Sequence, residues 1–392
     1  MLELKNNMNH SEENISDQND YEELPEGSFD FVQLDEAIHD QKFETEAVGY
    51  FRDAMRRFMR SKSAVVAFII IAIIVIMGFV GPLISNYTYR EQTPTAARLP
   101  PRIPWLENFG IFDGSVEMRV QTANIPINFA DSYISTIREH EIMGVPMSDI
   151  KVNAYVLSGV EDLYFWFGTD TLGRCIWTRT WQGVYISLII AVGSSFINLL
   201  IGLFLGALAG YYGGWVDMIL FRISEIIGAI PSIVIVMVLV IYVGAASLWT
   251  LMAAFILAGW IFFFRITRIQ IYRYKNREFV LASSTMGASD WRLIMKHIFP
   301  SAVGTLITLF ALTIPQTIMI ESGLTFLGLG LSPPTPSIGI MLMDGQSHLT
   351  TFPYRIVPPA IIISALMICF NLFGNGLRDA FDPSLRGTTE DA

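Results

Sequence analysis

The sequence predicts an all-α polytopic membrane protein with six transmembrane helices. Of its 392 residues, 52% are hydrophobic and only 16% are charged, whereas an ordinary soluble domain carries about 25% charged residues. Its mean hydropathy is +0.45. Six apolar runs are each long enough to cross a hydrocarbon core of about 30 Å as a helix. Because these runs are continuously apolar rather than alternating, the pattern excludes a transmembrane β-barrel.

The first apolar run covers residues 64–83 and carries no charged residue. It closes at Pro82 and the polar turn 85–86. No apolar run occurs within the first ~30 residues, where a secretory signal peptide has one. Six spans place both termini on the same side of the membrane. The five further runs are residues 184–209, 220–243, 248–264, 303–326 and 356–372.

The net charge of −10 is concentrated at the N-terminus. Residues 1–50 hold fourteen Asp and Glu against two Lys, which gives −12, and the other 342 residues carry 24 Lys and Arg against 22 Asp and Glu, which gives +2. Such an acidic segment of low hydrophobicity buries too little apolar surface to offset the entropy of ordering. We predict a disordered cytosolic tail over residues 1–62, with a basic juxtamembrane end, followed by the first transmembrane helix over 63–84. For residues 29–34 within the tail, the alternative is a short recognition helix or a segment that docks on a partner.

Basic residues near the spans predict the orientation, because loops rich in Lys and Arg stay in the cytoplasm. Five of them crowd the entrance to the first span, and seven lie in the connection 265–302. The connections 244–247 and 327–354 contain none. Arg174 and Arg179 argue the other way and are outnumbered. We therefore expect a multi-pass protein of the cytoplasmic membrane with both termini cytosolic.

This orientation makes residues 85–180 an extracellular segment. It is longer than a connector needs, so it forms either a small folded domain or a ribbon draped over the spans. Cys175 in this segment and Cys369 in the last span lie too far apart to pair across the bilayer, so no disulfide holds it. Residues 181–392 then make up a five-helix core.

Small residues and prolines inside the spans predict how the helices pack. From residue 202 onward, four glycines recur at every fourth position, which clears one helix face for close approach of another backbone. We favour packing within the chain over a subunit interface. Pro231 and Pro315 remove helical hydrogen bonds and are expected to bend the third and fifth spans. The glycines are Gly202, Gly206, Gly210 and Gly214.

Ionisable residues inside apolar spans are costly and are therefore candidates for function. Arg222 and Glu225 are three residues apart, so one helix face brings them together as an internal ion pair; a role in transport is the alternative. Glu321 has no evident local partner. It either caps a neighbouring turn or lines a pathway.

The chain lacks the common catalytic motifs. Its five His residues include no HExxH pair, and it has no Cys cluster, so no metal site is expected. No Lys follows a Gly, so the phosphate-binding loop GxxxxGK[ST] is absent. We expect a non-enzymatic chain without cofactors, and any ATP-driven activity would need another subunit. Nucleic acid is not an expected partner.

The basic loop before the fifth span predicts a compact cytosolic knob. Residues 279–286 form a short helix-prone stretch, Gly287 provides a turn, and Asp290 is placed to cap a second helix over 291–298 that Pro300 ends. A plain amphipathic connector is the alternative for such a pattern.

This loop resembles the "EAA" loop of transmembrane subunits of ATP-binding cassette (ABC) importers. Leu281 stands where Glu is usual, and Ser283 where the second Ala is usual. In that family the loop docks into a groove of the ATPase subunit. The matching residues are Ala282, Gly287, His297, Ile298 and Pro300. The coupling residues that the resemblance implies are Phe279, Leu281, Ala282, Ser283, Gly287, Ala288, Asp290, His297 and Pro300.

Four further stretches resemble the oligopeptide, dipeptide and nickel permeases. Residues 167–188 are similar to the GTD-x-x-GRD-x-x-SR signature, with Cys175 replacing the second Asp and Thr178 the Ser, and Tyr185 standing for a later Arg. The stretches 209–231, 321–342 and 370–387 match later signatures, with Glu225 and Asn375 at usual Asp positions. Their order is that of the second, or "C", permease subunit.

The resemblance implies the type I ABC importer fold with a MetI-like core and a long extracellular loop. It also implies a homologous permease partner, two ABC ATPase subunits that use ATP and Mg, and an extracellular substrate-binding protein. The implied mechanism is alternating access driven by the ATPases across the lipid bilayer.

Oligopeptides are the expected substrate, because the long outer segment and the tail resemble the oligopeptide branch. A dipeptide or nickel importer of the same family is the alternative. Two other classes stay open at this stage. An ion-coupled secondary transporter would use intramembrane carboxylates, and a membrane scaffold would need no glycine-jointed loop.

Overall fold

The computed structural model describes residues 50–244 and 246–381, and the predicted tail lies mostly outside them. The helices and strands along the chain are α1 (Tyr50–Arg60), α2 (Lys62–Ile84), β1 (Ser115–Gln121), α3 (Ile125–Asn128), β2 (Tyr133–Ile142), β3 (Val145–Asn153), α4 (Ala154–Leu157), α5 (Ile176–Tyr212), α6 (Gly214–Gly228), α7 (Ser232–Val243), α8 (Leu248–Lys275), α9 (Glu278–Thr285), α10 (Asp290–Arg292), a π-helix (Leu293–Ile298), α11 (Phe299–Phe326), α12 (Ile338–Gln346) and α13 (Val357–Phe381).

The long apolar helices account for the predicted spans. Five helical segments are long and apolar enough to cross a membrane, and the bent pair α6 and α7 brings the number to six within the described residues. The pair turns by 77° at the break before Ser232, where Pro231 cannot donate a backbone hydrogen bond. This bend confirms the prediction for Pro231. In contrast, α11 runs through Pro315 as one helix.

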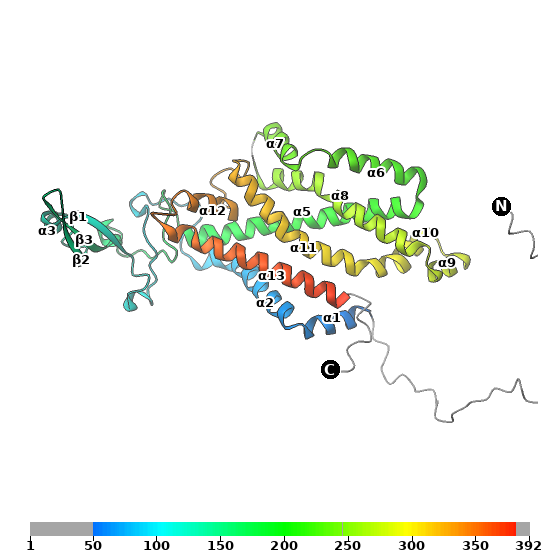
Figure 1. The fold of residues 1–392 in the computed structure, drawn as a ribbon, viewed down its shortest axis with the longest axis horizontal. Helices are drawn as coiled ribbons and strands as arrows, with labels where there is room; N and C mark the ends of the chain where they lie inside the picture. Colours follow the sequence, from blue (N-terminus) through cyan, green and yellow to red (C-terminus); the bar gives the residue numbers. More distant parts are fainter. Residues whose placement is uncertain (1–49, 245, 382–392) are drawn as a thin grey trace, which may run out of the picture. The chain divides into compact units, whose positions relative to one another are not determined.

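The helix α5 lies among the other long helices and holds them together (Figure 1). Its 37 residues contact α2, α8 and α11. A buried apolar cluster joins α2, α5, α11 and α13, and includes Ile71, Val184, Ile318 and Leu366. The predicted span 184–209 is shorter than α5, which begins at Ile176. Residues 176–183 include Thr, Arg and Gln and so do not resemble a lipid-facing helix.

The glycine face of α5 packs against α8. A Cβ on Gly202 would lie 2.4 Å from Cβ of Phe263, one on Gly206 2.7 Å from the carbonyl oxygen of Phe264, and one on Gly210 2.8 Å from Cβ of Ile271. The prediction of packing within the chain is therefore confirmed for these three glycines. Gly214 does not take part: it begins α6 with φ +51°, and nothing lies within 4 Å of its Cβ position.

The second helix of the predicted knob does not end at Pro300. Residues Asp290–Phe326 form one continuous helical segment, with π-helical turns over Leu293–Ile298 directly before Pro300. Pro300 lacks the N–H of an ordinary helical turn, and its ring clashes with the carbonyl four residues earlier. The wider π turn accommodates it, so the helix continues.

The long segment between α2 and α5 contains a small sheet with the strand order β1-β3-β2. Both pairings are antiparallel, with Ser115 opposite Asn153 in the first and Ile142 opposite Val145 in the second. The side-chain amide oxygen of Asn153 accepts from the N–H groups of Tyr155 and Val156 and so caps the start of α4. Tyr155 and Phe165 belong to a separate buried cluster, against which Val116 of β1 packs. These residues belong to the same compact unit as the helices, and the choice between a folded domain and a ribbon for residues 85–180 stays a prediction.

Candidate functional site

The loop predicted to dock a partner forms a compact knob at the opposite end of the long helices from the sheet (Figure 1). The helix α9 follows α8 after two residues, and Gly287 turns the chain back toward α10 with φ +81°. The N–H of Gly287 donates to the carbonyl of Ser284 over 2.9 Å, and that of Ala288 donates to Ser283 over 3.1 Å. This is the left-handed turn that glycine favours at a helix end.

The knob packs against the adjacent ends of the transmembrane helices and hydrogen-bonds to them. Val280 on α9 is buried in a cluster with Ile271 on α8 and with Leu293 and Ile298 in the π-helix. The hydroxyl of Tyr211 at the end of α5 donates to Oδ1 of Asp290 over 2.7 Å. The ammonium of Lys275 donates to the backbone carbonyl of Tyr211. A displacement of α9 would therefore carry the ends of α5, α8 and α11 with it.

The opposite side of α9 faces outward. Phe279 is 46% exposed, Leu281 51% and Met286 81%, and Ala282 is also exposed. We call these four residues the α9 surface. Two large exposed apolar side chains on one short helix, with a third at its C-cap, are typical of an interaction site.

The remaining predicted coupling residues support this surface or lie apart from it. Ser283 donates to the carbonyl of Phe279, and Ala288 and His297 are half-buried. Pro300 is exposed at the second position of α11. Asp290 is not the cap that we predicted: Ser289 holds that position, and Asp290 begins α10.

Arg222 and Glu225 form the predicted pair on α6, with Nη1 and Oε2 2.7 Å apart. The pair is largely exposed, since 73% of the Arg222 side chain and 39% of the Glu225 side chain are accessible. It therefore lies on the outside of this chain.

Glu321 does have partners, contrary to its appearance in the sequence. It is 1% exposed on α11, and its two oxygens accept from the hydroxyls of Ser187 over 3.1 Å and Thr325 over 3.2 Å. Ser187 also accepts from the N–H of Ile338 over 3.2 Å. Glu321 thus connects α5, α11 and the start of α12.

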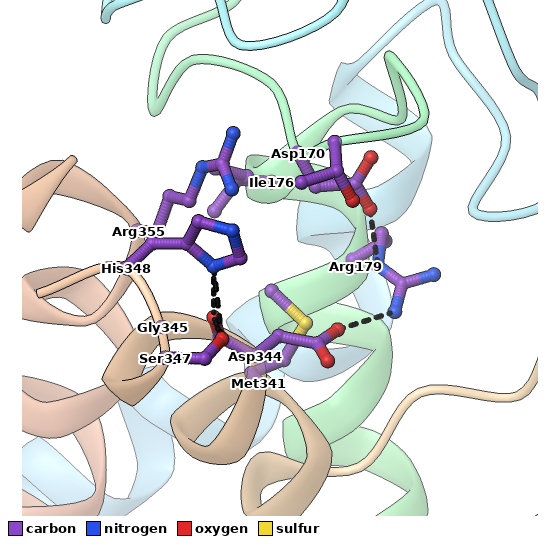
Figure 2. Close-up of a pocket in the computed structure, with 10 residues that line it drawn as sticks. Asp170, Ile176, Arg179, Met341, Asp344, Gly345, Ser347, His348 and Arg355 are labelled. Carbon is purple, nitrogen blue, oxygen red and sulfur yellow. Dashed lines mark hydrogen bonds and ion pairs between the residues drawn. The ribbon is translucent and has the colours of Figure 1, made fainter. Parts of the chain in front are cut away.

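A charged cluster near the sheet end of α5 was not predicted (Figure 2). Arg174 Nε lies 2.6 Å from Oδ2 of Asp170. Arg179, whose side chain is 2% exposed, lies 3.6 Å from Asp170 and 3.6 Å from Asp344. Burial raises the pKa of Asp344, while Arg179 and Arg174 act against that rise. The stretch 167–188 was the available signal, because it contains Asp170, Arg174 and Arg179.

The ion pair of Asp217 and Arg268 joins α6 to α8 at the knob end of the helices. Both oxygens of Asp217 accept from the guanidinium of Arg268, and one of them also accepts from the hydroxyl of Tyr272 over 2.9 Å. Arg268 lies over the rings of Phe221 and Tyr272 as well. Arg268 is therefore used inside the fold. The basic residues of this end that are exposed are Arg265, Arg273, Arg277, Arg292 and Lys296.

Comparison with known proteins identifies the family. Residues 202–387 match the inner membrane component of binding-protein-dependent transport systems, and residues 49–101 match the N-terminal transmembrane domain of oligopeptide transport permease C. The oligopeptide permease OppC of Bacillus subtilis is 35% identical over 88% of this chain and 93% of its own length. The chain belongs to this ABC importer permease family.

Other relatives extend the permease comparison. The dipeptide permease DppC of Lactococcus lactis is 35% identical over 88% of this chain and 93% of its own length. The glutathione permease GsiD of Pectobacterium atrosepticum is 36% identical over 56% of this chain and 73% of its own length. A chain in a structure of the methionine transporter MetNI in inward-facing conformations also matches, with 17% identity and a TM-score of 0.42. The match covers 51% of this chain and 95% of the MetNI chain.

Within the permease, the described residues contain no group of three or more His, Cys, Asp or Glu side chains able to hold a metal ion. The two family matches fall on the helical core and on the first helices, α1 and α2. The α9 surface, Glu321 and Asp344 all lie inside the first of these matches. The sheet lies between the two.

Proposed function

We propose that the chain is the second permease subunit of an importer that moves oligopeptides across the cytoplasmic membrane by alternating access. In this proposal a homologous permease subunit completes the pathway. Two separate ABC ATPase subunits bind Mg and hydrolyse ATP, and an extracellular binding protein delivers the peptide. The names of the relatives support the transported class, since OppC of Bacillus subtilis and OppC of Haemophilus influenzae are oligopeptide permeases.

The α9 surface is the observation that carries the coupling part of the proposal. It presents three large exposed side chains, while Val280 on the other side of α9 is held by α8 and the π-helix. An ATPase subunit bound to this surface moves when the two ATPase subunits close on ATP. That movement would displace α9 and, through the Val280 cluster, the ends of α8 and α11. The pathway between the two permease subunits would then open toward the binding protein, and hydrolysis would reset it.

Leu281→Arg tests the docking role. The added charge faces outward, so the chain should fold, but the ATPase should no longer co-purify and ATP-dependent uptake should fall to background. Leu349→Arg is the matched control, because Leu349 is 49% exposed and lies beyond α12. Unchanged ATPase recovery with Leu281→Arg would contradict the docking role.

The proposed orientation has both termini and α9 in the cytosol and the sheet outside. Cysteine labelling checks it, because both native cysteines are buried. Met143→Cys in the turn between β2 and β3 should react with a membrane-impermeant maleimide in intact cells. Ser284→Cys on α9 should react only after permeabilisation. The reverse labelling pattern would invert the topology.

Dipeptides are the second candidate substrate, because DppC of Lactococcus lactis matches with the same identity and coverage as OppC of Bacillus subtilis. Competition of uptake by peptides of two to six residues separates the candidates. Inhibition that is confined to dipeptides would favour the dipeptide assignment. No observation on the described residues favours nickel.

A further inference from the structure

The charged cluster near the start of α5 encloses a cavity of about 50 Å³. Figure 2 shows Asp170, Arg179 and Asp344 on one side of it and His348 and Arg355 on the other. Its walls come from the segment before α5, from α5 itself, from α12 and from the residues just before α13. A volume of this size exceeds what one water molecule needs, and it is too small for a peptide.

Two buried arginines at this cavity have nitrogen atoms without acceptors. Arg179 is 2% exposed and Arg355 is 4% exposed. Within residues 50–244 and 246–381, Nε and Nη1 of Arg179 and Nε and Nη2 of Arg355 have no hydrogen-bond partner. The nearest carboxylates to Arg179 are 3.6 Å away, beyond an ordinary hydrogen bond. Arg355 lies over the ring of Phe352, 4.7 Å from its centre.

The charges of the cluster do not cancel. Arg179 and Arg355 line the cavity together with Asp170 and Asp344, and Arg174 pairs with Asp170 beside it. These three arginines and two aspartates leave one positive charge. An arginine in a protein does not lose its proton. A buried excess charge is strongly unfavourable unless it is paired. Water could accept from the free N–H groups, but only an anion would also neutralise the charge.

We propose that this cavity binds one small monovalent anion, which accepts hydrogen bonds from Arg179 and Arg355. The bound anion links α5 to α12 and to the start of α13 at the sheet end of the helices. A free halide and a carboxylate group share this chemistry. The cavity volume favours the halide, and the carboxylate of a bound peptide is the other source.

The test measures thermal unfolding of the full-length chain, purified with its partner subunits, while chloride or bromide replaces the bulky sulfonate isethionate at constant ionic strength. The expected result is a saturable rise in Tm with either halide, which Arg355→Met abolishes. Arg119→Met is the control, because Arg119 pairs with Asp149 on the sheet and lies outside the cavity. An equal halide shift in Arg355→Met and in the unmodified protein would overturn the proposal.

A second variant keeps the proposal testable if Arg355→Met does not fold. Asp344→Asn removes one negative charge and raises the excess to two, so the halide concentration at half-effect should fall. A purely structural role for the ion pairs predicts no tightening, and an unchanged or higher half-effect concentration would overturn the site.

A tripeptide and its C-terminal amide distinguish the two sources of the anion in isethionate buffer. A shift with the free acid alone, lost in Arg355→Met and without any halide response, would assign the site to the peptide carboxylate. The absence of both responses in the unmodified protein would overturn the proposal.

Discussion

The hydroxyl of Ser187 on α5 donates a hydrogen bond to Oε2 of Glu321 on α11, and both residues are 1% exposed. The same hydroxyl accepts from the backbone N–H of Ile338, the first residue of α12. One serine therefore satisfies a buried carboxylate and a helix N-terminus at once. This relationship explains why a glutamate is tolerated in an apolar helix.

Ser187→Ala should lower stability, because it removes a donor to Oε2 of Glu321 and leaves the N–H of Ile338 without the hydroxyl that accepts from it. Each unsatisfied buried group costs about 1–3 kcal/mol, so thermal unfolding in detergent should occur several degrees lower. Glu321→Gln keeps an acceptor for Ser187 and should cost less. Ser63→Ala, at an exposed position of α2, provides the control. Equal unfolding temperatures for Ser187→Ala and Ser63→Ala would contradict this account.

Gly206→Ala should also destabilise the protein, through crowding of the contact between α5 and α8. The added methyl would lie 2.7 Å from the carbonyl oxygen of Phe264 and 2.7 Å from Cβ of Thr267, and overpacking costs about 1–3 kcal/mol. Gly323→Ala on α11 is the matched control, because nothing lies within 4 Å of its added methyl. That variant should be neutral, or stabilised by up to about 1 kcal/mol from helix propensity. Thermal unfolding of the two variants in parallel decides the question.

Local patterns in the sequence predicted the helices and the glycine face well, because each depends on residues close together in the chain. The four-residue glycine spacing indicated close packing of α5, and three of the four glycines contact α8. Pro231 likewise indicated the bend between α6 and α7. These features need no knowledge of which helices become neighbours.

The features that the sequence did not reveal depend on distant contacts. Ser187, one partner of Glu321, could not be foreseen because it lies 134 positions away, whereas Thr325, four residues on, was a local partner that went unrecognised. Arg179 counted as a topological charge, since nothing local indicated that Asp344 would lie beside it. The sequence predicted a helix that ends at Pro300, but π-helical turns before the proline let the helix continue. Local sequence patterns do not indicate such turns.

Gly287→Val should reduce uptake strongly, whereas Gly287→Asn should retain most of it. The backbone φ of +81° is accessible to glycine, tolerated by Asn and unfavourable for a β-branched residue. No atom lies within 4 Å of a Cβ at this position, so the difference tests backbone conformation rather than crowding. ATP-dependent uptake at equal membrane abundance is the measurement. Similar uptake by both variants would show that the left-handed turn is not required.

The sheet contains a carboxylate whose ionisation should control local stability. Oδ2 of Asp113 lies 2.7 Å from Nζ of Lys151 on β3, and Oδ1 accepts from the N–H and hydroxyl of Ser115 on β1. Burial acts to raise the pKa of Asp113, but the contacts with Lys151 and Ser115 outweigh it and hold the pKa below its usual value. The ionised form is therefore favoured in the folded sheet.

Because the pKa is lower in the folded state than in the unfolded state, Asp113 stabilises the sheet above the ordinary pKa of about 3.9. This stabilisation should be lost as the pH falls through the lowered value. Hydrogen exchange of β1 and β3, corrected for intrinsic rates, should show a loss of protection in acid. Asp113→Asn should remove most of that pH dependence and lower protection at pH 7. Glu139→Gln, at an exposed position on β2, should leave both unchanged, and an acid response that persists in Asp113→Asn would assign it to another group.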